Sequence, residues 1–326
     1  MRIAHQQTNG RNRTSPRGMA LVAVLWLIVI LSFAVVTAVS LLNFQLDVAD
    51  SQINGFRARM AAEMGISVGA NPAVERDDPL LNYANEDGES YSVEIKTEGG
   101  RFNINFLLAE KAGGNDKRLI KEIFIRWGID NDVAQEISDA LMDWTDPNDE
   151  VQANGAEKEE YEKMGRLNQP FNRPFYSLDE VRLVRGWDII ERARPDWRDW
   201  FTVWSQGGLD INEADAEKIS IAAECNPEDA DSLVEIVRGP DGIRGTEDDS
   251  PFQSLGENEN GPSVMDVLRV PDFYAQVISA RLAVNDATVR IESTGIAGAS
   301  KRKIILTLRN RAGKPAILEK KEEIIP

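Results

Sequence analysis

The sequence contains one histidine and one cysteine among its 326 residues. A single cysteine cannot form a disulfide within the chain or supply a Cys-x-x-Cys metal cluster. Because His5 is the single histidine, it is the one residue that could serve as the base of a Ser-His-Asp or Cys-His catalytic site. Basic residues are also scarce, with 37 Lys and Arg against 54 Asp and Glu and a formal net charge of -17. This charge balance argues against binding nucleic acid, whose backbone requires a basic surface.

A basic segment followed by a long apolar run stands out at the N-terminus. Residues 1–18 contain four arginines and no acid, residues 19–42 carry no charge, and Asp47 is the first acidic residue of the chain. The run exceeds the roughly 7–15 apolar residues of a secretory signal and reaches the ~20 that a membrane-spanning helix needs. Because basic residues precede the run, the N-terminus is predicted to be cytoplasmic and the rest of the chain to lie across the membrane.

The remaining pattern predicts an α+β fold. Helical spacing of apolar residues continues to about residue 70, alternation at 91–96 indicates a strand, and β-rich runs at 288–293 and 303–308 indicate a hairpin. A largely helical region separates these strand signals. We therefore expect a long N-terminal helix and a small antiparallel sheet, interrupted by a large all-α insertion. The predicted boundaries are 1–18 (leader), 19–70 (helix), 71–101 with 280–326 (sheet), and 102–207 and 208–279 (two helical segments).

Two short patterns occur twice, in the same order, within this helical region. Asn-Ile-Asn at 103–105 and Asp-Ile-Asn at 210–212 are both followed by Ala-Glu-Lys, at 109–111 and 216–218. Ser-Leu-Asp-Glu-Val at 177–181 likewise corresponds to Ser-Val-Met-Asp-Val at 263–267. The matched ends predict that the two helical segments are related copies of one unit.

Each helical segment also contains a loop dense in acidic residues, near 143–161 and 239–249. Calcium takes six to eight oxygen ligands, and crowded carboxylates repel one another unless a cation neutralises them. Neither loop has the spacing of an EF-hand. A solvated acidic loop without any metal explains the same composition, so both interpretations stay open on composition alone.

The junction Arg17-Gly18-Met19 places a glycine between the basic leader and the apolar run. It resembles the prepilin peptidase site of type IV pilins and type II secretion pseudopilins. The resemblance implies cleavage between Gly18 and Met19 and methylation of the new N-terminus. Most members carry Glu at the fifth position of the processed chain, where this sequence has Ala23. That departure is typical of the minor pseudopilin K family, because a subunit that starts a filament has no neighbour to pair with a buried Glu.

The resemblance to the pseudopilin K family implies a structural role and no enzymatic activity. Such a subunit sits at the tip of the pseudopilus and initiates assembly with other minor pseudopilins. Its further partners are the major pseudopilin, the prepilin peptidase and the inner-membrane secretion platform, and it supports export of folded periplasmic proteins across the outer membrane. The family implies a single inner-membrane span with a periplasmic C-terminal domain.

The same resemblance implies helical units similar to sterile-alpha-motif or helix–hairpin–helix modules, with calcium bound in the insertion. The candidate calcium ligands of the first loop are Asp143, Asp146, Asn148, Asp149 and Glu157. Those of the second loop are Asp241, Glu247, Asp248 and Asp249.

Two other interpretations of the chain remain. A signal-anchored periplasmic calcium-binding adhesion or scaffold protein would keep residues 1–18, whereas a processed pseudopilin would lose them. A membrane-anchored hydrolase could use a pair of carboxylates as acid and base, although no pair stands out from the acidic background.

Overall fold

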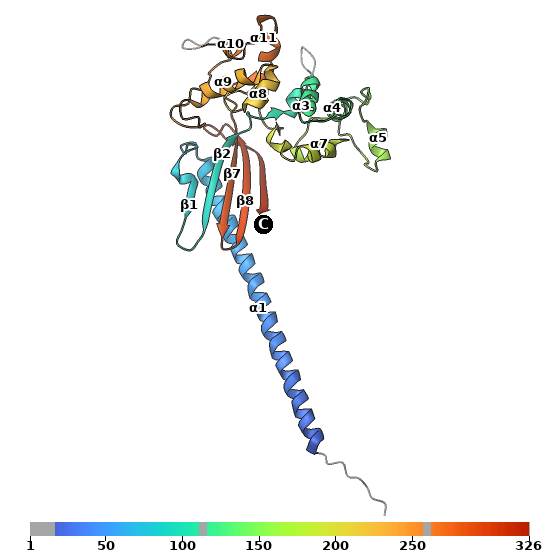
Figure 1. The fold of residues 1–326 in the computed structure, drawn as a ribbon, viewed down its shortest axis with the longest axis vertical. Helices are drawn as coiled ribbons and strands as arrows, with labels where there is room; N and C mark the ends of the chain where they lie inside the picture. Colours follow the sequence, from blue (N-terminus) through green and yellow to red (C-terminus); the bar gives the residue numbers. More distant parts are fainter. Residues whose placement is uncertain (1–16, 111–115, 257–261, 326) are drawn as a thin grey trace, which may run out of the picture. The chain divides into compact units, whose positions relative to one another are not determined.

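The computed structural model describes residues 17–110, 116–256 and 262–325. The chain divides into two compact units, Met1–Phe56 and Arg57–Pro326. Helix α1 (Arg17–Ala70) begins in the first unit and ends in the second (Figure 1). It starts two residues before the predicted boundary at residue 19. The leader residue His5 lies outside the described residues.

The first unit exposes its apolar side chains. Every large apolar side chain from Leu21 to Phe44 is at least 50% exposed. A helix that is apolar all round is normally buried in a large core or in a membrane. Within the described residues, one helix is long and apolar enough to cross a membrane, and it is α1.

The second unit contains a five-stranded antiparallel sheet in the order β1-β2-β7-β8-β9. The predicted early strand and late hairpin are confirmed as β2 and as β7 with β8, and the hairpin strands are longer than predicted. Strands β1 and β9 were not predicted. The strands are β1 (Asn82–Ala84), β2 (Ser90–Thr97), β7 (Thr288–Ala297), β8 (Ser300–Arg309) and β9 (Ala316–Ile325), with a short 3-10 turn, η1 (Pro79–Leu81), before β1.

The part of α1 in the second unit packs closely on this sheet through small residues. Ala58 and Ala62 are fully buried. A Cβ atom added to Gly295 of β7 would lie 2.0 Å from the Ala58 carbonyl oxygen and 2.4 Å from the Ala62 nitrogen. Only glycine therefore allows the helix backbone to approach β7 this closely.

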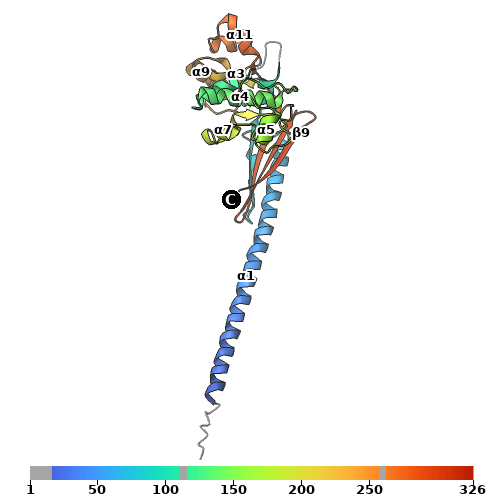
Figure 2. The ribbon, with the colours of Figure 1, turned by 90° about the vertical axis from the view of Figure 1, so that its right-hand side faces the viewer.

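The insertion between β2 and β7 is mainly helical, and most of its helices lie beyond one end of the sheet strands (Figures 1 and 2). Its first segment contains β3 (Phe102–Asn103), α2 (Ile104–Leu108), α3 (Lys117–Arg126), α4 (Asn131–Thr145), α5 (Lys158–Lys163), α6 (Leu178–Val181), α7 (Trp187–Ala193), η2 (Trp197–Asp199) and β4 (Phe201–Thr202). Its second segment contains β5 (Leu209–Asp210), α8 (Ala216–Ala223), α9 (Pro227–Arg238), α10 (Val264–Val267), α11 (Asp272–Ser279) and β6 (Leu282–Ala283).

In each of the two segments, a short strand at the start pairs with a short strand at the end. β3 pairs in parallel with β4, and β5 pairs in parallel with β6. The Asn105 side chain donates to the Phe175 carbonyl at 2.9 Å and accepts from the Phe175 N–H at 2.8 Å. Asn212 makes the same pair of hydrogen bonds with Phe252, both at 2.9 Å. Each asparagine thus connects the start of its segment, by two hydrogen bonds, to the phenylalanine of a Pro-Phe pair that precedes a later helix.

Candidate metal centre

The first acidic loop follows α4 and is anchored by aromatic packing. Trp144, on the last turn of α4, is fully buried. The centre of its ring lies 5.4 Å from the centre of the Tyr161 ring in α5 and 6.2 Å from the centre of the Phe175 ring. Aromatic pairs of this kind add roughly 0.5–1.5 kcal/mol each beyond the area they bury. These aromatic contacts fix both ends of the loop, so its charged side chains have defined positions.

Asp143 is a completely buried carboxylate at the base of this loop. Its Oδ1 accepts a hydrogen bond of 3.1 Å from the Gln152 backbone N–H. Burial raises the pKa of Asp143 to about 6, and the nearby Asp146 and Asp139 charges act in the same direction. A Cβ atom on Gly155 would lie 1.9 Å from Asp143 Oδ2. The loop can close over Asp143 because residue 155 has no side chain.

Glu157 shows the clearest sign of a missing partner. It is only 4% exposed, and neither of its carboxylate oxygens has a hydrogen-bond partner among the residues that the structure describes. Burial raises its pKa to about 7, and the charges of Asp143 and Asp146 add to the effect. A buried carboxylate without a partner is costly, and a bound cation would remove that cost. The residues therefore fit a hard cation such as calcium, which prefers oxygen ligands.

The other candidates of the first loop lie near Glu157. Asp146 Oδ1 accepts from the Asn148 N–H at 3.3 Å, and burial raises the pKa of Asp146. Asp149 accepts a hydrogen bond of 3.0 Å from the Asn172 side chain. The carboxylates of Asp143, Asp146 and Asp149 all act on the pKa of Glu157. In the part of the chain that the structure describes, however, no three such side chains already stand in a metal-holding arrangement. Binding would therefore require side-chain rotation.

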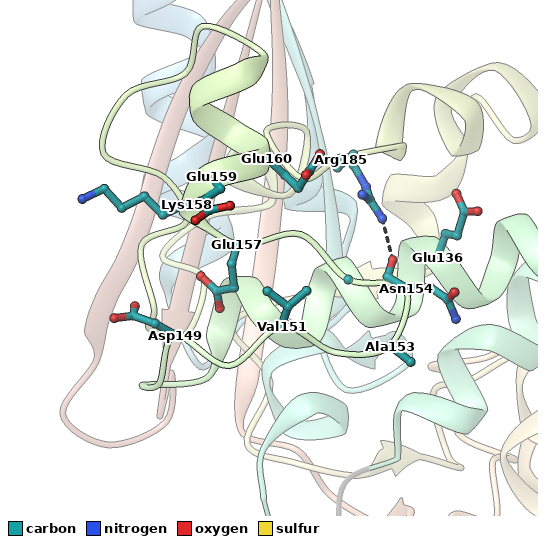
Figure 3. Close-up of a pocket in the computed structure, with 11 residues that line it drawn as sticks. Glu136, Asp149, Val151, Ala153, Asn154, Glu157, Lys158, Glu159, Glu160 and Arg185 are labelled. Atoms are coloured by element: carbon teal, nitrogen blue, oxygen red, sulfur yellow. Dashed lines mark hydrogen bonds between the residues drawn. The ribbon is translucent and has the colours of Figure 1, made fainter.

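A pocket of about 680 Å³ opens beside this loop. Figure 3 shows the Glu157 carboxylate on the side of the pocket between Asp149 and Val151. Across the pocket, Arg185 donates to the Asn154 carbonyl oxygen at 2.5 Å. The pocket is also lined by Glu136 of α4 and by Glu159 and Glu160 of α5. The sequence did not indicate these three glutamates or Arg185, because helical spacing alone does not show that α4 and α5 face one pocket.

Most carboxylates of the second acidic loop accept hydrogen bonds from residues of the same loop. Asp248 accepts from the Asp241 N–H at 3.0 Å and from the Thr246 hydroxyl at 2.8 Å, and these bonds lower its pKa. Asp249 Oδ2 accepts from the Gly245 N–H at 2.6 Å, whereas its Oδ1 is buried and has no hydrogen-bond partner within the described ranges. Glu247 is exposed. The structure thus gives the second loop less need of a cation than the first.

The predicted processing residues lie in or near the first turns of α1. Gly18 and Met19 have helical backbone, and Ala23 belongs to the exposed apolar stretch. Ala23 places no charged group in that stretch.

Comparisons with known proteins agree with this architecture. Residues 100–195, which include the first acidic loop, match the family model of type II secretion system protein K. The type II secretion system protein K of Pseudomonas aeruginosa (strain PAO1) is 26% identical over 208 residues, which cover 62% of this chain and 59% of that relative. The match thus spans less than two thirds of the relative's own length.

A solved structure has the same fold. It is the crystal structure of the GspK-GspI-GspJ complex from the type 2 secretion system of enterotoxigenic Escherichia coli. The match has a TM-score of 0.57 and 15% identity, and it covers 87% of this chain and 98% of the matched chain. The chain is thus similar to type II secretion system protein K over residues 100–195 and to the Pseudomonas relative over part of its length, and it shares the helix-and-sheet fold of the solved chain.

Proposed function

We propose that the chain is a minor pseudopilin at the tip of a type II secretion pseudopilus. The observation that carries this proposal is the combination of one apolar N-terminal helix, a small antiparallel sheet and a helical insertion that matches the protein K family. The similar solved chain was crystallised in a complex named for three such proteins, K, I and J. Other minor pseudopilins are therefore the first expected partners, and assembly would start from their complex.

The N-terminal part of α1 would anchor the protein in the inner membrane, with the N-terminus in the cytoplasm and the second unit in the periplasm. The exposed apolar side chains from Leu21 to Phe44 and the preceding arginines support this orientation. The prepilin peptidase would cut between Gly18 and Met19, and the new N-terminus would be methylated. With Ala23 in place of a Glu, the helix needs no partner for a buried charge.

The insertion would give the tip its shape. We infer that its two segments are copies of one unit, because both are closed by a parallel strand pair and by an asparagine bonded to a phenylalanine backbone. Its bulk would prevent a further subunit from adding beyond it. The major pseudopilin would then extend the filament from the inner-membrane secretion platform and support export of folded periplasmic proteins. The role is assembly, with neither catalysis nor nucleic-acid binding.

The first acidic loop would bind calcium. Asp143, Asp146 and Glu157 are the buried ligand candidates, and Asn148 and Asp149 are the exposed candidates. Calcium would supply the positive charge that the unpartnered Glu157 carboxylate lacks. Gly155 leaves the space in which the Asp143 carboxylate sits. The carboxylates of the second loop, Asp241, Glu247, Asp248 and Asp249, remain a second candidate site.

Co-expression tests the assembly role. The full chain should co-purify with the other minor pseudopilins of its own secretion system and should restore secretion to cells that lack it. The mass of the membrane form should correspond to a chain that begins at Met19. A chain that keeps residues 1–18 and purifies alone would overturn the proposal and would favour a signal-anchored calcium-binding adhesion or scaffold protein.

A further inference from the structure

Another pocket, of about 640 Å³, opens where β7 begins and where β8 turns into β9. Its volume lies within the ~300–1,000 Å³ of ordinary ligand pockets, so it can hold more than one side chain. Apolar or small residues form most of its wall, namely Pro72, Ala287, Val289, Ala312 and Gly313. Arg311 and Lys314 also line it, whereas none of the described residues that line it is acidic. The pocket is therefore positive, although the whole chain has a formal net charge of -17.

Arg311 carries a charge for which the described residues supply no carboxylate. Its Nη2 donates to the Asn71 and Val74 carbonyl oxygens, at 2.5 and 2.6 Å, and these bonds hold the β8–β9 turn against the loop after α1. Its Nε is buried and has no hydrogen-bond partner in the described part of the chain. Burial and the nearby charge of Arg76 both lower the pKa of Arg311, and within the described ranges no acidic side chain acts in the opposite direction. A carboxylate is the usual partner of a guanidinium, and here that partner is missing from the described residues.

Lys314 adds a second positive charge three residues further along the same turn. It is exposed, and it makes no hydrogen bond or ion pair with the residues that the structure describes. The pocket thus combines two positive charges with a wall of apolar and small residues. The group that complements both features is a carboxylate beside an apolar side chain.

We propose that this pocket receives an acidic side chain of a partner polypeptide, with its carboxylate at Arg311 and Lys314 and an adjacent apolar residue against the wall. The inference rests on the proposed assembly role, in which a partner subunit must dock on this chain. The partner segment would also bridge the β8–β9 turn and the loop after α1, because residues of both line the pocket.

The test uses the purified full chain in lipid nanodiscs and blocked tripeptides as probes. The dissociation constants of acetyl-Leu-Glu-Leu-amide and acetyl-Leu-Gln-Leu-amide are compared by NMR titration. Lys314→Glu reverses one charge of the pocket, and the control Lys301→Glu reverses the charge of an exposed lysine of β8 that does not line it. Arg311→Met removes the other charge together with its two bonds to the loop after α1. Lys314→Glu leaves those bonds in place, so it decides the test if Arg311→Met does not fold.

The glutamate peptide should bind the wild-type chain and the Lys301→Glu control alike, and the Lys314→Glu variant about tenfold more weakly, because a repulsive charge replaces an attractive one. Equal binding of the glutamine peptide to the wild type, or unchanged binding of the glutamate peptide to Lys314→Glu, would overturn the proposal. Hexanoate serves as a free carboxylate with an apolar chain, and tighter binding of hexanoate than of the glutamate peptide would overturn the choice of a polypeptide. Co-purification with other pseudopilins is measured separately. Its absence in the wild type, with peptide binding retained, would refute the assembly role without refuting the pocket's specificity for an acidic side chain.

Discussion

Gly155 leaves no room for a side chain beside Asp143, since a Cβ atom at position 155 would lie 1.9 Å from Asp143 Oδ2. Gly155→Ala should therefore push the Asp143 carboxylate out of place and destabilise the fold by about 1–3 kcal/mol, the usual cost of overpacking. Thermal unfolding of the full chain measures this loss. Gly256→Ala is the matched control, because a Cβ atom there meets no atom of the described residues within 4 Å and stability should be unchanged.

The Glu157→Gln variant should separate the cost of burying this carboxylate from its contribution to calcium binding. In chelator, the variant should be more stable than the wild type by about 1 kcal/mol, because it removes a buried charge without a partner. In calcium, the wild-type melting temperature should rise and that of the variant should rise much less. An equal calcium shift in both proteins would show that Glu157 is not a ligand. The exposed α9 residue Glu228, changed to Gln, serves as control.

Asp210 should make stability depend on pH. It is 1% exposed, and burial first, followed by the charges of Glu213 and Asp286, raises its pKa to about 6. The folded chain thus binds this proton more tightly than the unfolded chain. Its stabilising contribution is complete below about pH 4 and is lost as the pH rises through about 6. Asp210→Asn stays neutral, so its stability relative to the wild type should improve by up to about 2 kcal/mol between pH 4 and pH 7.

Thermal unfolding at several pH values checks this prediction. The decisive quantity is the difference between the two proteins at each pH, since other carboxylates titrate in both. A difference that is constant from pH 4 to pH 7 would contradict the assigned pKa direction.

Glu98 and Arg101 form a buried ion pair where the sheet meets the insertion. Their side chains are 2% and 8% exposed, and Glu98 also accepts from the Thr202 hydroxyl. Arg101→Met should cost about 3 kcal/mol, because it leaves the buried Glu98 with only Arg290, whose Nε lies 3.8 Å from Glu98 Oε1. The double variant Glu98→Gln/Arg101→Met should cost clearly less than Arg101→Met alone. A double variant as unstable as the single one would show that packing, not charge, dominates there.

Gly18→Val should block processing if the prepilin peptidase recognises this junction. Intact-mass measurement of the membrane form should then show residues 1–18 retained, whereas the wild type should begin at a methylated Met19. The Ala23→Ser variant, which leaves the junction intact, should be processed normally. Retention of the leader in the wild type would contradict the proposed cleavage.

The sequence predicted those parts of the fold whose physical cause is local. The apolar helix and the alternating strand β2 follow from hydropathy and period. Strand β9 was missed because Glu319, Lys320, Lys321 and Glu322 interrupt any alternation. The structure explains these charges, since Lys320 bonds to Glu63 of α1 and Lys321 to Asp179 of the insertion. Partners distant in the chain determine this strand, and no short pattern contains them.

The candidate site was predictable only in outline. Acidic density indicated both loops, but it could not show that Glu157 is buried without a partner while Asp248 is satisfied by hydrogen bonds of its own loop. Burial depends on Trp144 and Tyr161 packing together across the loop. Tertiary packing thus separates two loops of similar composition.

Strands β2 and β7 pair from Thr97 with Val289 to Ser90 with Ile296, although the whole insertion separates them in the chain. Their pairing must close a very long loop, and the entropy cost of closure grows with loop length. An insertion that folds first brings the two strand ends together and removes most of that cost. We therefore expect the helical insertion to fold before the sheet, with the sheet as the slow step of folding.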